Sequence, residues 1–170
     1  MTWSIRVAAR EDARALPPVE SSASRRFLAI PDLALLPDDD MPVEAHERYI
    51  AQGTEWVAVN ESHELVGFLA AEIVNRDLHL WELAVRGDVQ SKGIGRQLIG
   101  AAEIFARERH LHSLTLTTFS DVPWNAPWYS RMGFEISVGD ERLTALVRAE
   151  IERGLPRRCA MRRTVDGMQR

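Results

Sequence analysis

Apolar and polar residues alternate along several short stretches of the chain, beginning with residues 3–7 near the N-terminus. A two-residue period is typical of a strand that buries one face. Three further apolar stretches, 55–59, 65–74 and 78–85, are separated by short polar connections. This spacing predicts an antiparallel meander of strands in the first half of the chain.

Helical spacing precedes that meander. The acidic pair at residues 11–12 opens a helical region that runs towards Phe27, but the prolines at 17–18 must kink or restart it. A loop rich in proline and aspartate at residues 30–42 and a short helix at residues 43–51 then lead into the strands.

Helical spacing also follows the meander. Apolar residues recur at helical intervals from residue 94 to residue 105, and residues 114–119 resume the pattern of a strand. The second half of the chain therefore begins with a strand–helix–strand unit. The remaining predicted elements are a short helix at 124–132, a strand at 134–138, an amphipathic helix at 143–154 and a strand at 159–164.

Composition narrows the class of protein. No internal repeat or linker interrupts the chain, so we expect one domain over residues 1–170. Hydrophobic residues make up 45% and charged residues 27%, the mixture of an ordinary globular protein. With 21 Lys and Arg against 25 Asp and Glu, the net charge of -4 gives no general reason to bind nucleic acid or anionic lipid.

The sequence also argues against secretion and membrane insertion. Its N-terminus lacks a basic segment followed by an apolar run, and no stretch approaches the ~20 apolar residues of a membrane span. The single cysteine, Cys159, cannot form an intramolecular disulfide. We therefore expect a cytoplasmic protein that does not contact a membrane.

The most informative segment is the turn at residues 90–96, which follows the last strand of the meander and opens a helix. Glycine at positions 93 and 95 lets a ligand approach the main chain closely. The first turn of a helix presents unpaired N–H groups at the positive end of its dipole. The turn therefore suits a pyrophosphate, although an isolated Gly-x-Gly also occurs where a strand simply turns tightly into a helix.

Two better-known phosphate-binding motifs do not fit this turn. A P-loop needs Gly-x-x-x-x-Gly-Lys-Ser/Thr, which is absent, and a dinucleotide fingerprint needs glycine at 98, where Leu98 stands. The preceding meander also differs from the alternating strands and helices of a doubly wound sheet. A nucleotide-binding enzyme is therefore a rival class. Competition for binding by coenzyme A, but not by NAD or ATP, would argue against it.

The turn instead resembles the signature of the GNAT superfamily of acyl-coenzyme A-dependent N-acetyltransferases, Gln/Arg-x-x-Gly-x-Gly/Ala, which residues 90–95 match in full. The resemblance includes the preceding strand at 83–85 and the following helix at 98–99. It extends to residues 129–134, Tyr-Ser-Arg-Met-Gly-Phe, which are similar to the family's Tyr-x-x-x-Gly-Phe ending. The order of elements from Ile5 to Thr164 also fits.

This resemblance implies an α/β (α+β) fold with a mixed, mostly antiparallel sheet of about seven strands flanked by helices. A splay between strands 4 and 5 would admit the pantetheine arm of acetyl-coenzyme A. Backbone groups of Leu83, Ala84 and Val85 would bind that arm, and one near Ala84 or Val85 would polarise the thioester carbonyl. The amides expected to hold the pyrophosphate are those of Gln90, Ser91, Lys92, Gly93, Ile94, Gly95 and Arg96.

Acetyl transfer to an amine requires a base, because an alkylamine with a pKa near ~10.4 is mostly ammonium at neutral pH. Glu82, beside the presumed carbonyl-binding strand, is one candidate, acting directly or through water; an exposed charge on the strand is the alternative. His79, three residues earlier, is the competing candidate. Regular pairing would place residues 79 and 82 on opposite faces, so only a bulge would let both line one wall.

The candidate acid is Tyr129, which lies where many members of the family use tyrosine to protonate the departing thiolate of coenzyme A. Packing of the aromatic ring on the sheet is its alternative role. The family often places asparagine seven residues earlier, where this chain has Val122. Asn125, four residues before the tyrosine, is expected either to cap the short helix or to contact the cofactor.

The sequence thus predicts an N-acetyltransferase that moves an acetyl group from acetyl-coenzyme A to a primary amine of a small molecule or peptide in a ternary complex. The alternative is a non-catalytic acyl-coenzyme A sensor or partner-binding module. No metal is expected, because His110-x-His112 falls short of a coordination set. The acceptor depends on the loop at 31–41, the first helices and the region at 143–154, and it is left open. A homodimer is possible because dimers are common in similar proteins.

Overall fold

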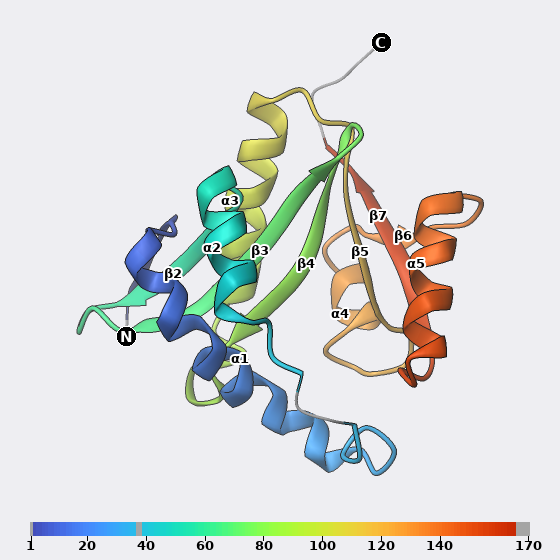
Figure 1. The fold of residues 1–170 in the computed structure, drawn as a ribbon, viewed down its shortest axis with the longest axis horizontal. Helices are drawn as coiled ribbons and strands as arrows, with labels where there is room; N and C mark the ends of the chain where they lie inside the picture. The colour runs from blue at the N-terminus through green and yellow to red at the C-terminus, as the bar shows by residue number, and fades with distance from the viewer. Residues whose placement is uncertain (1, 37–38, 166–170) are drawn as a thin grey trace. The chain divides into compact units, whose positions relative to one another are not determined.

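The computed structural model describes residues 2–36 and 39–165 (Figure 1), so residues 37 and 38 of the predicted acceptor loop lie outside the described residues. The chain forms two compact units. Unit 1 consists of the residues up to Glu72 together with Trp81–Phe105, and unit 2 consists of Ile73–Leu80 together with the residues from Ala106 onwards.

A seven-stranded sheet in the order β1-β2-β3-β4-β5-β7-β6 confirms the predicted fold class. Its strands are β1 (Trp3–Val7), β2 (Glu55–Asn60), β3 (Leu65–Val74), β4 (Asp77–Val85), β5 (Ser113–Phe119), β6 (Glu135–Ile136) and β7 (Arg158–Thr164). Strands β4 and β5 pair in parallel, and their registered pairs stop at Leu80↔Leu116 although both strands continue. The ladder therefore ends part-way along both strands, as the predicted splay requires.

In unit 1 the alternation of the meander separates two packed faces. Val57, Val59 and Phe68 belong to one buried cluster with residues of α1 (Leu16–Ser24) and α2 (Val43–Gln52). Trp56, on the opposite face of β2, packs edge-on against Phe105 of α3 (Ile94–Glu108), with ring centroids 5.3 Å apart. Figure 1 shows α2 and α3 on opposite sides of β2 and β3.

The first helical region restarts at its prolines, as predicted. A 3-10 helix over Arg10–Ala15 precedes α1, and Pro17 and Pro18 occupy the first turn of α1, where a missing N–H costs nothing. A second 3-10 helix over Arg25–Ala29 follows. The buried residues of α1 are Leu16, Val19 and Glu20, so a glutamate shares the face that contacts the core.

Gly67 of β3 lets the first turn of α3 lie directly on the sheet. A Cβ at this position would be 3.0 Å from the Ala84 carbonyl oxygen, 3.2 Å from Ile94 Cγ2 and 3.4 Å from Leu98 Cδ1. Ile94 and Leu98 are almost completely buried. Close packing of the sheet against α3 therefore fixes the position of the turn that precedes this helix.

Unit 2 contains β5, β7 and β6 with α4 (Ala126–Ser130) and α5 (Glu141–Glu152). The predicted strand at 134–138 is reduced to β6, because Gly139 turns the chain at a φ of +84° and Asp140 caps α5. Helix α5 buries Glu150 and exposes Ile151, the reverse of the apolar periodicity. Glu150 is tolerated there because Arg158 Nε and Thr117 Oγ1 donate to it at 2.9 and 2.7 Å.

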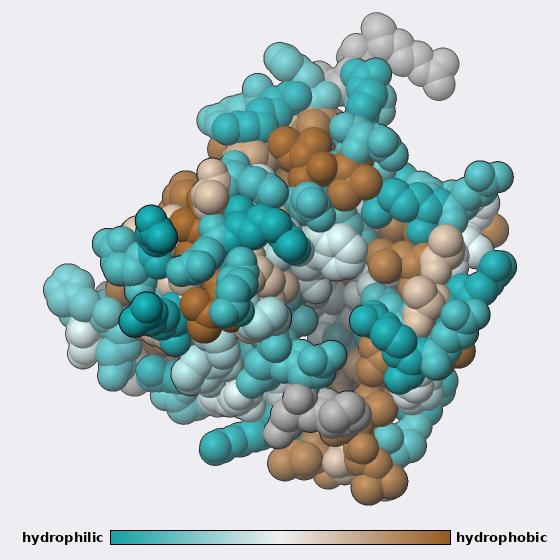
Figure 2. Space-filling view, viewed as in Figure 1, coloured by the Kyte–Doolittle hydropathy of each residue, from teal (hydrophilic) through white to brown (hydrophobic). Residues whose placement is uncertain are grey.

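Figure 2 shows a surface that is mostly hydrophilic on the viewed face, with apolar residues in separate patches. Leu28, just before the predicted acceptor loop, and Leu35, within it, are 65% and 86% exposed. Among the residues placed by the structure, no helix is long and apolar enough to cross a membrane.

We predict that Gly67→Ala destabilises the protein by about 1–3 kcal/mol, because the added methyl group meets the backbone of Ala84 and the side chains of α3. Urea denaturation measures this loss. Gly100→Ala is the matched control: its Cβ meets nothing within 4 Å on α3, so it should stabilise the helix by roughly 0.5–1 kcal/mol. Equal stability of the two variants would contradict the packing argument.

Candidate active site

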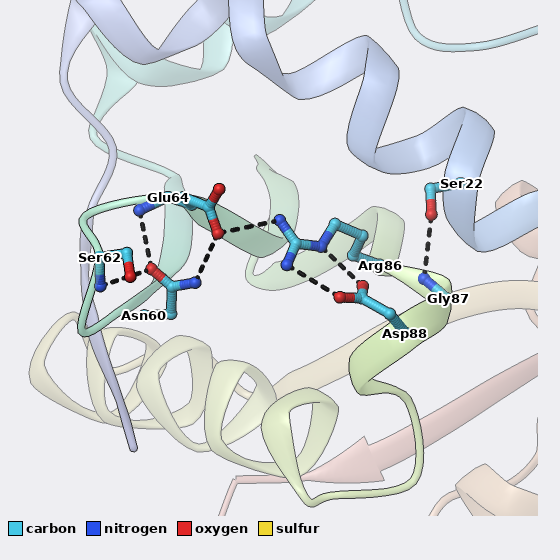
Figure 3. Close-up of polar contacts among 7 residues, drawn as sticks. All are labelled: Ser22, Asn60, Ser62, Glu64, Arg86, Gly87 and Asp88. Carbon is cyan, nitrogen blue, oxygen red and sulfur yellow. Dashed lines mark hydrogen bonds and ion pairs between the residues drawn. The ribbon is translucent and has the colours of Figure 1, made fainter. Parts of the chain in front are cut away.

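The end of β4 is held in place by the side chain of Arg86 (Figure 3). Its Nε and Nη2 atoms donate to the two carboxylate oxygens of Asp88 at 2.7 and 2.9 Å, and Nη1 lies 3.5 Å from Glu64. The backbone N–H of Arg86 donates to the Val66 carbonyl at 2.8 Å. A bidentate pair and a ladder bond thus fix the residue from which the predicted pyrophosphate turn departs.

The turn is also attached to α1. The backbone N–H of Gly87 donates to Ser22 Oγ at 3.0 Å, as Figure 3 shows. Gln90 Nε2 donates to the Val85 carbonyl at 2.9 Å and to the Ala23 carbonyl at 3.3 Å. The side chain of Gln90 therefore braces the turn against both β4 and α1.

Backbone conformation explains the residue types in the turn. Ser91 and Gly93 have φ angles of +63° and +91°, the left-handed region that glycine adopts without strain. A Cβ on Gly93 would meet nothing within 4 Å, so conformation rather than crowding within the chain favours glycine there. Lys92 and Arg96 are exposed beside it.

Helix α3 begins at Ile94, and the Gln97 N–H donates to the Gly93 carbonyl at 3.2 Å. By helix geometry the amides of Ile94, Gly95 and Arg96 have no acceptor within the helix. They lie at the positive end of its dipole, so this turn has the arrangement that binds an anionic phosphate group.

The predicted pantetheine-binding strand lies directly before this turn. Ala84 is buried in the cluster shared with α1 and α2, whereas Leu83 and Val85 are half-buried. None of the three belongs to the registered pairs between β4 and β5, which end at Leu80.

Glu82, the first candidate base, is half-buried in unit 1 and has an acidic neighbour that sequence reasoning missed. This neighbour is Glu20 of α1, whose side chain accepts a hydrogen bond from the Met41 N–H at 2.8 Å. Burial, and next the negative charge of Glu82, raise the pKa of Glu20 to about 8, against the opposing effect of that hydrogen bond. Glu20 therefore carries a proton at neutral pH.

A signal for Glu20 is present in the sequence. Leu16, Val19, Glu20 and Ala23 follow the i, i+3, i+4, i+7 spacing of a core-facing helix stripe, so a glutamate stands where an apolar residue is expected. Ionisable residues in such a position are uncommon and often functional.

His79, the competing base candidate, lies in unit 2 and is fully buried. Its Nδ1 atom is 2.9 Å from Thr115 Oγ1 of β5. Burial, and next the positive charge of Arg142, lower the pKa of His79 to about 3. The imidazole is therefore neutral and weakly basic throughout the physiological pH range.

Tyr129 and Asn125 lie at the two ends of one turn of α4 in unit 2. The ring of Tyr129 is half-buried and packs edge-on against Trp128 and Phe134, with centroid distances of 5.0 and 5.5 Å. Asn125 is the N-cap residue by position, but its side chain makes no capping hydrogen bond. Within the described chain, its Oδ1 atom is buried without a hydrogen-bond partner.

The predicted site residues thus fall into two groups. Unit 1 brings together the strand residues 82–85, the turn 90–96 and helix α1. Unit 2 contains His79, Asn125 and Tyr129. Across residues 2–36 and 39–165, no group of three or more His, Cys, Asp or Glu side chains is arranged to hold a metal ion.

Comparisons with solved structures give the same fold. The PaiA N-acetyltransferase from Thermoplasma acidophilum in complex with coenzyme A matches with a TM-score of 0.73 and 16% identity, over 96% of this chain and 99% of that chain. The ribosomal-protein-S18-alanine N-acetyltransferase from Escherichia coli matches with a TM-score of 0.69 and 16% identity, over 99% and 97%.

A larger protein matches as well. N-acetylglutamate synthase from Neisseria gonorrhoeae, complexed with coenzyme A and N-acetyl-glutamate, gives a TM-score of 0.70 and 19% identity, over 98% of this chain and 36% of that chain. The family described as acetyltransferase (GNAT) matches residues 22–134, which include the end of α1, the turn and the segment around Tyr129. The chain therefore belongs to the GNAT family of acetyltransferases and is an acyltransferase of that type.

Proposed function

We propose that this protein transfers the acetyl group of acetyl-coenzyme A directly to a primary amine within a ternary complex. The observation that carries the proposal is the turn at residues 90–96, where left-handed backbone at Ser91 and Gly93 leads into unpaired amides at the start of α3. The solved relative from Thermoplasma acidophilum contains coenzyme A, which supports the same ligand here.

In the proposed complex, the amides of Gln90 to Arg96 bind the pyrophosphate and the backbone of Leu83 to Val85 binds the pantetheine arm. The amine nitrogen attacks the thioester carbonyl carbon, forming the C–N bond as the C–S bond breaks. A backbone N–H near Ala84 or Val85 stabilises the oxyanion, and Tyr129 protonates the thiolate.

We propose Glu82 rather than His79 as the group that accepts the amine proton. His79, with a pKa of about 3, binds a proton too weakly for this task at neutral pH. Glu82 directly precedes residues 83–85, which are proposed to bind the pantetheine arm, and its side chain is half-buried. Asn125 is proposed to contact the cofactor through its buried Oδ1 atom, which has no partner among the described residues.

The acceptor is proposed to be an amine of a small molecule or a peptide. The named relatives include an enzyme for a ribosomal-protein alanine and one whose complex holds N-acetyl-glutamate, so this fold accommodates both classes. A panel of amines tested for release of coenzyme A would separate them.

The first test of the turn is Gly93→Ala. Because residue 93 has a φ of +91° and the new methyl group would point into space reserved for the ligand, affinity for coenzyme A should fall at least about tenfold, measured by calorimetry. Gly53→Ala is the matched control, since Gly53 also has a positive φ of +71° and free space around its Cβ. Both variants should lose similar stability, but only the first should lose affinity.

Unchanged affinity in a folded Gly93→Ala protein would remove the turn from the binding site. Equal loss of affinity in the Gly53→Ala protein would instead assign the effect to general destabilisation.

The second test is Tyr129→Phe, which removes the proposed proton donor and keeps the ring packed against Trp128 and Phe134. We expect kcat to fall by about 10²-fold, the usual contribution of one general acid, with little change in the Kd of coenzyme A. Tyr49→Phe is the control, because the chain's other tyrosine is buried in the core cluster of unit 1.

Stopped assays with a thiol-reactive dye measure both variants. Full activity of Tyr129→Phe would exclude the phenol as the acid. If wild-type protein binds coenzyme A but forms no free coenzyme A from acetyl-coenzyme A with any amine, the non-catalytic sensor is favoured.

A further inference from the structure

Glu20 is a buried carboxyl group on the face of α1 that contacts the core. It is 8% exposed, and its neighbours in the stripe, Leu16 and Val19, belong to the cluster that contains Ala84 of β4. Two hydrogen bonds attach the same helix to the segment that follows β4. The Gly87 N–H donates to Ser22 Oγ, and Gln90 Nε2 donates to the Ala23 carbonyl. These contacts hold Glu20 near the strand that carries Glu82.

No cation in the described residues pairs with the side chain of Glu20, whose assigned hydrogen bond comes from the Met41 N–H. An isolated carboxylate is costly to bury, so such a group keeps its proton instead of ionising. Glu150 shows the contrast within this chain, because Arg158 supplies a positive charge to that buried glutamate at 2.9 Å.

The other charged groups around Glu20 come from three elements. Glu82 of β4 and Asp40, in the segment before α2, both disfavour its ionisation, whereas His46 of α2 favours it. His46 is fully buried, its Nδ1 atom is 2.6 Å from Glu55 Oε1, and its Nε2 atom has no hydrogen-bond partner among the described residues. The acidic groups outweigh the imidazole because burial acts in the same direction.

Resting on the function proposed above, we propose that Glu20 is a positioning residue that holds a proton beside Glu82, so that the two side chains act as a carboxyl pair with a single negative charge. The protonated carboxyl of Glu20 keeps Glu82 as the ionised member and orients it towards the acceptor amine. Two adjacent carboxylates resist double ionisation, which makes this division of one proton the stable state.

Proton balance in the reaction follows from this arrangement. As the neutral amine nitrogen bonds to the acetyl carbon and the C–S bond breaks, the amine proton passes to the Glu82 carboxylate, and the thiolate takes a proton from Tyr129. The pair is then neutral, with one proton on each carboxyl group, and Tyr129 is a phenolate. On product release Glu82 loses its proton to water and Tyr129 takes one from water, which restores both groups.

The test compares Glu20→Gln and Glu20→Ala with wild type. An amide at position 20 imitates the protonated carboxyl, so Glu20→Gln should keep kcat/KM within about twofold at pH 7, whereas Glu20→Ala should lose at least about tenfold in kcat. Calorimetry should give an unchanged Kd for coenzyme A in both. If the Gln variant is as inactive as the Ala variant, or the Ala variant is fully active, the proposal is wrong.

The dependence on pH separates this role from a structural one. Glu20 of wild type ionises as pH rises through about 8, and Gln cannot, so the ratio of wild-type to Glu20→Gln kcat/KM should be constant below pH 7 and fall about threefold or more by pH 9. Titration of the amine cancels in this ratio. Glu150→Gln is the control for loss of a buried glutamate, and its ratio to wild type should not vary with pH. A constant ratio for Glu20→Gln would overturn the proposal.

Carboxyl ¹³C NMR tests the pair even if no acceptor is found. Wild type should show one glutamate carboxyl that titrates near pH 8, absent from Glu20→Gln and shifted to lower pH in Glu82→Gln. No glutamate carboxyl titrating above pH 6 would disprove the carboxyl pair. Failure of acetyl transfer with this signal present would refute the proposed function and leave the pair intact.

Discussion

The close packing of α3 on the sheet is the constraint on which the turn at residues 90–96 depends. Gly67 has no side chain, so Ile94 and Leu98 lie against β3 and the first turn of the helix has one position. Unpaired amides bind an anion well only when they are already oriented, because ordering them on binding would cost free energy. Many individually weak packing contacts therefore set the position of the amides at the start of α3.

Helix α1 adds a second constraint, since it contacts the same turn from another direction. Ser22 accepts from the Gly87 amide, and the Ala23 carbonyl accepts from the side chain of Gln90. Gln90 is thus the residue of the family signature whose side chain is structural, and glycine at 93 is the residue whose backbone angle matters. In this chain the signature thus combines a side-chain brace at Gln90 with a left-handed turn at Gly93.

Most of the fold was predictable because its elements are amphipathic. The strands of the meander and helix α3 were predicted near their observed bounds, and the prolines of α1 marked the restart correctly. The shortening of β6 was not predictable from alternation, since the left-handed Gly139 and the Asp140 cap end it. The burial of Glu150 was not predictable either. It depends on hydrogen bonds from Arg158 and Thr117, and the apolar pattern of the sequence does not show that these residues lie together.

The same limit explains which site residues sequence reasoning found. Residues 90–96 are contiguous, so one motif identifies them, whereas Glu20 and Glu82 are distant in sequence, and the charge of Glu82 acts on Glu20 only because α1 packs near β4. Alternation on β4 left Glu82 and His79 equivalent; burial distinguishes them, because it lowers the pKa of His79 to about 3. Desolvation thus acts oppositely on the two kinds of group: it makes a buried imidazole a poorer base and makes a buried carboxyl group hold its proton. The carboxyl pair proposed above depends on that difference, with buried Glu20 as the member that holds the proton.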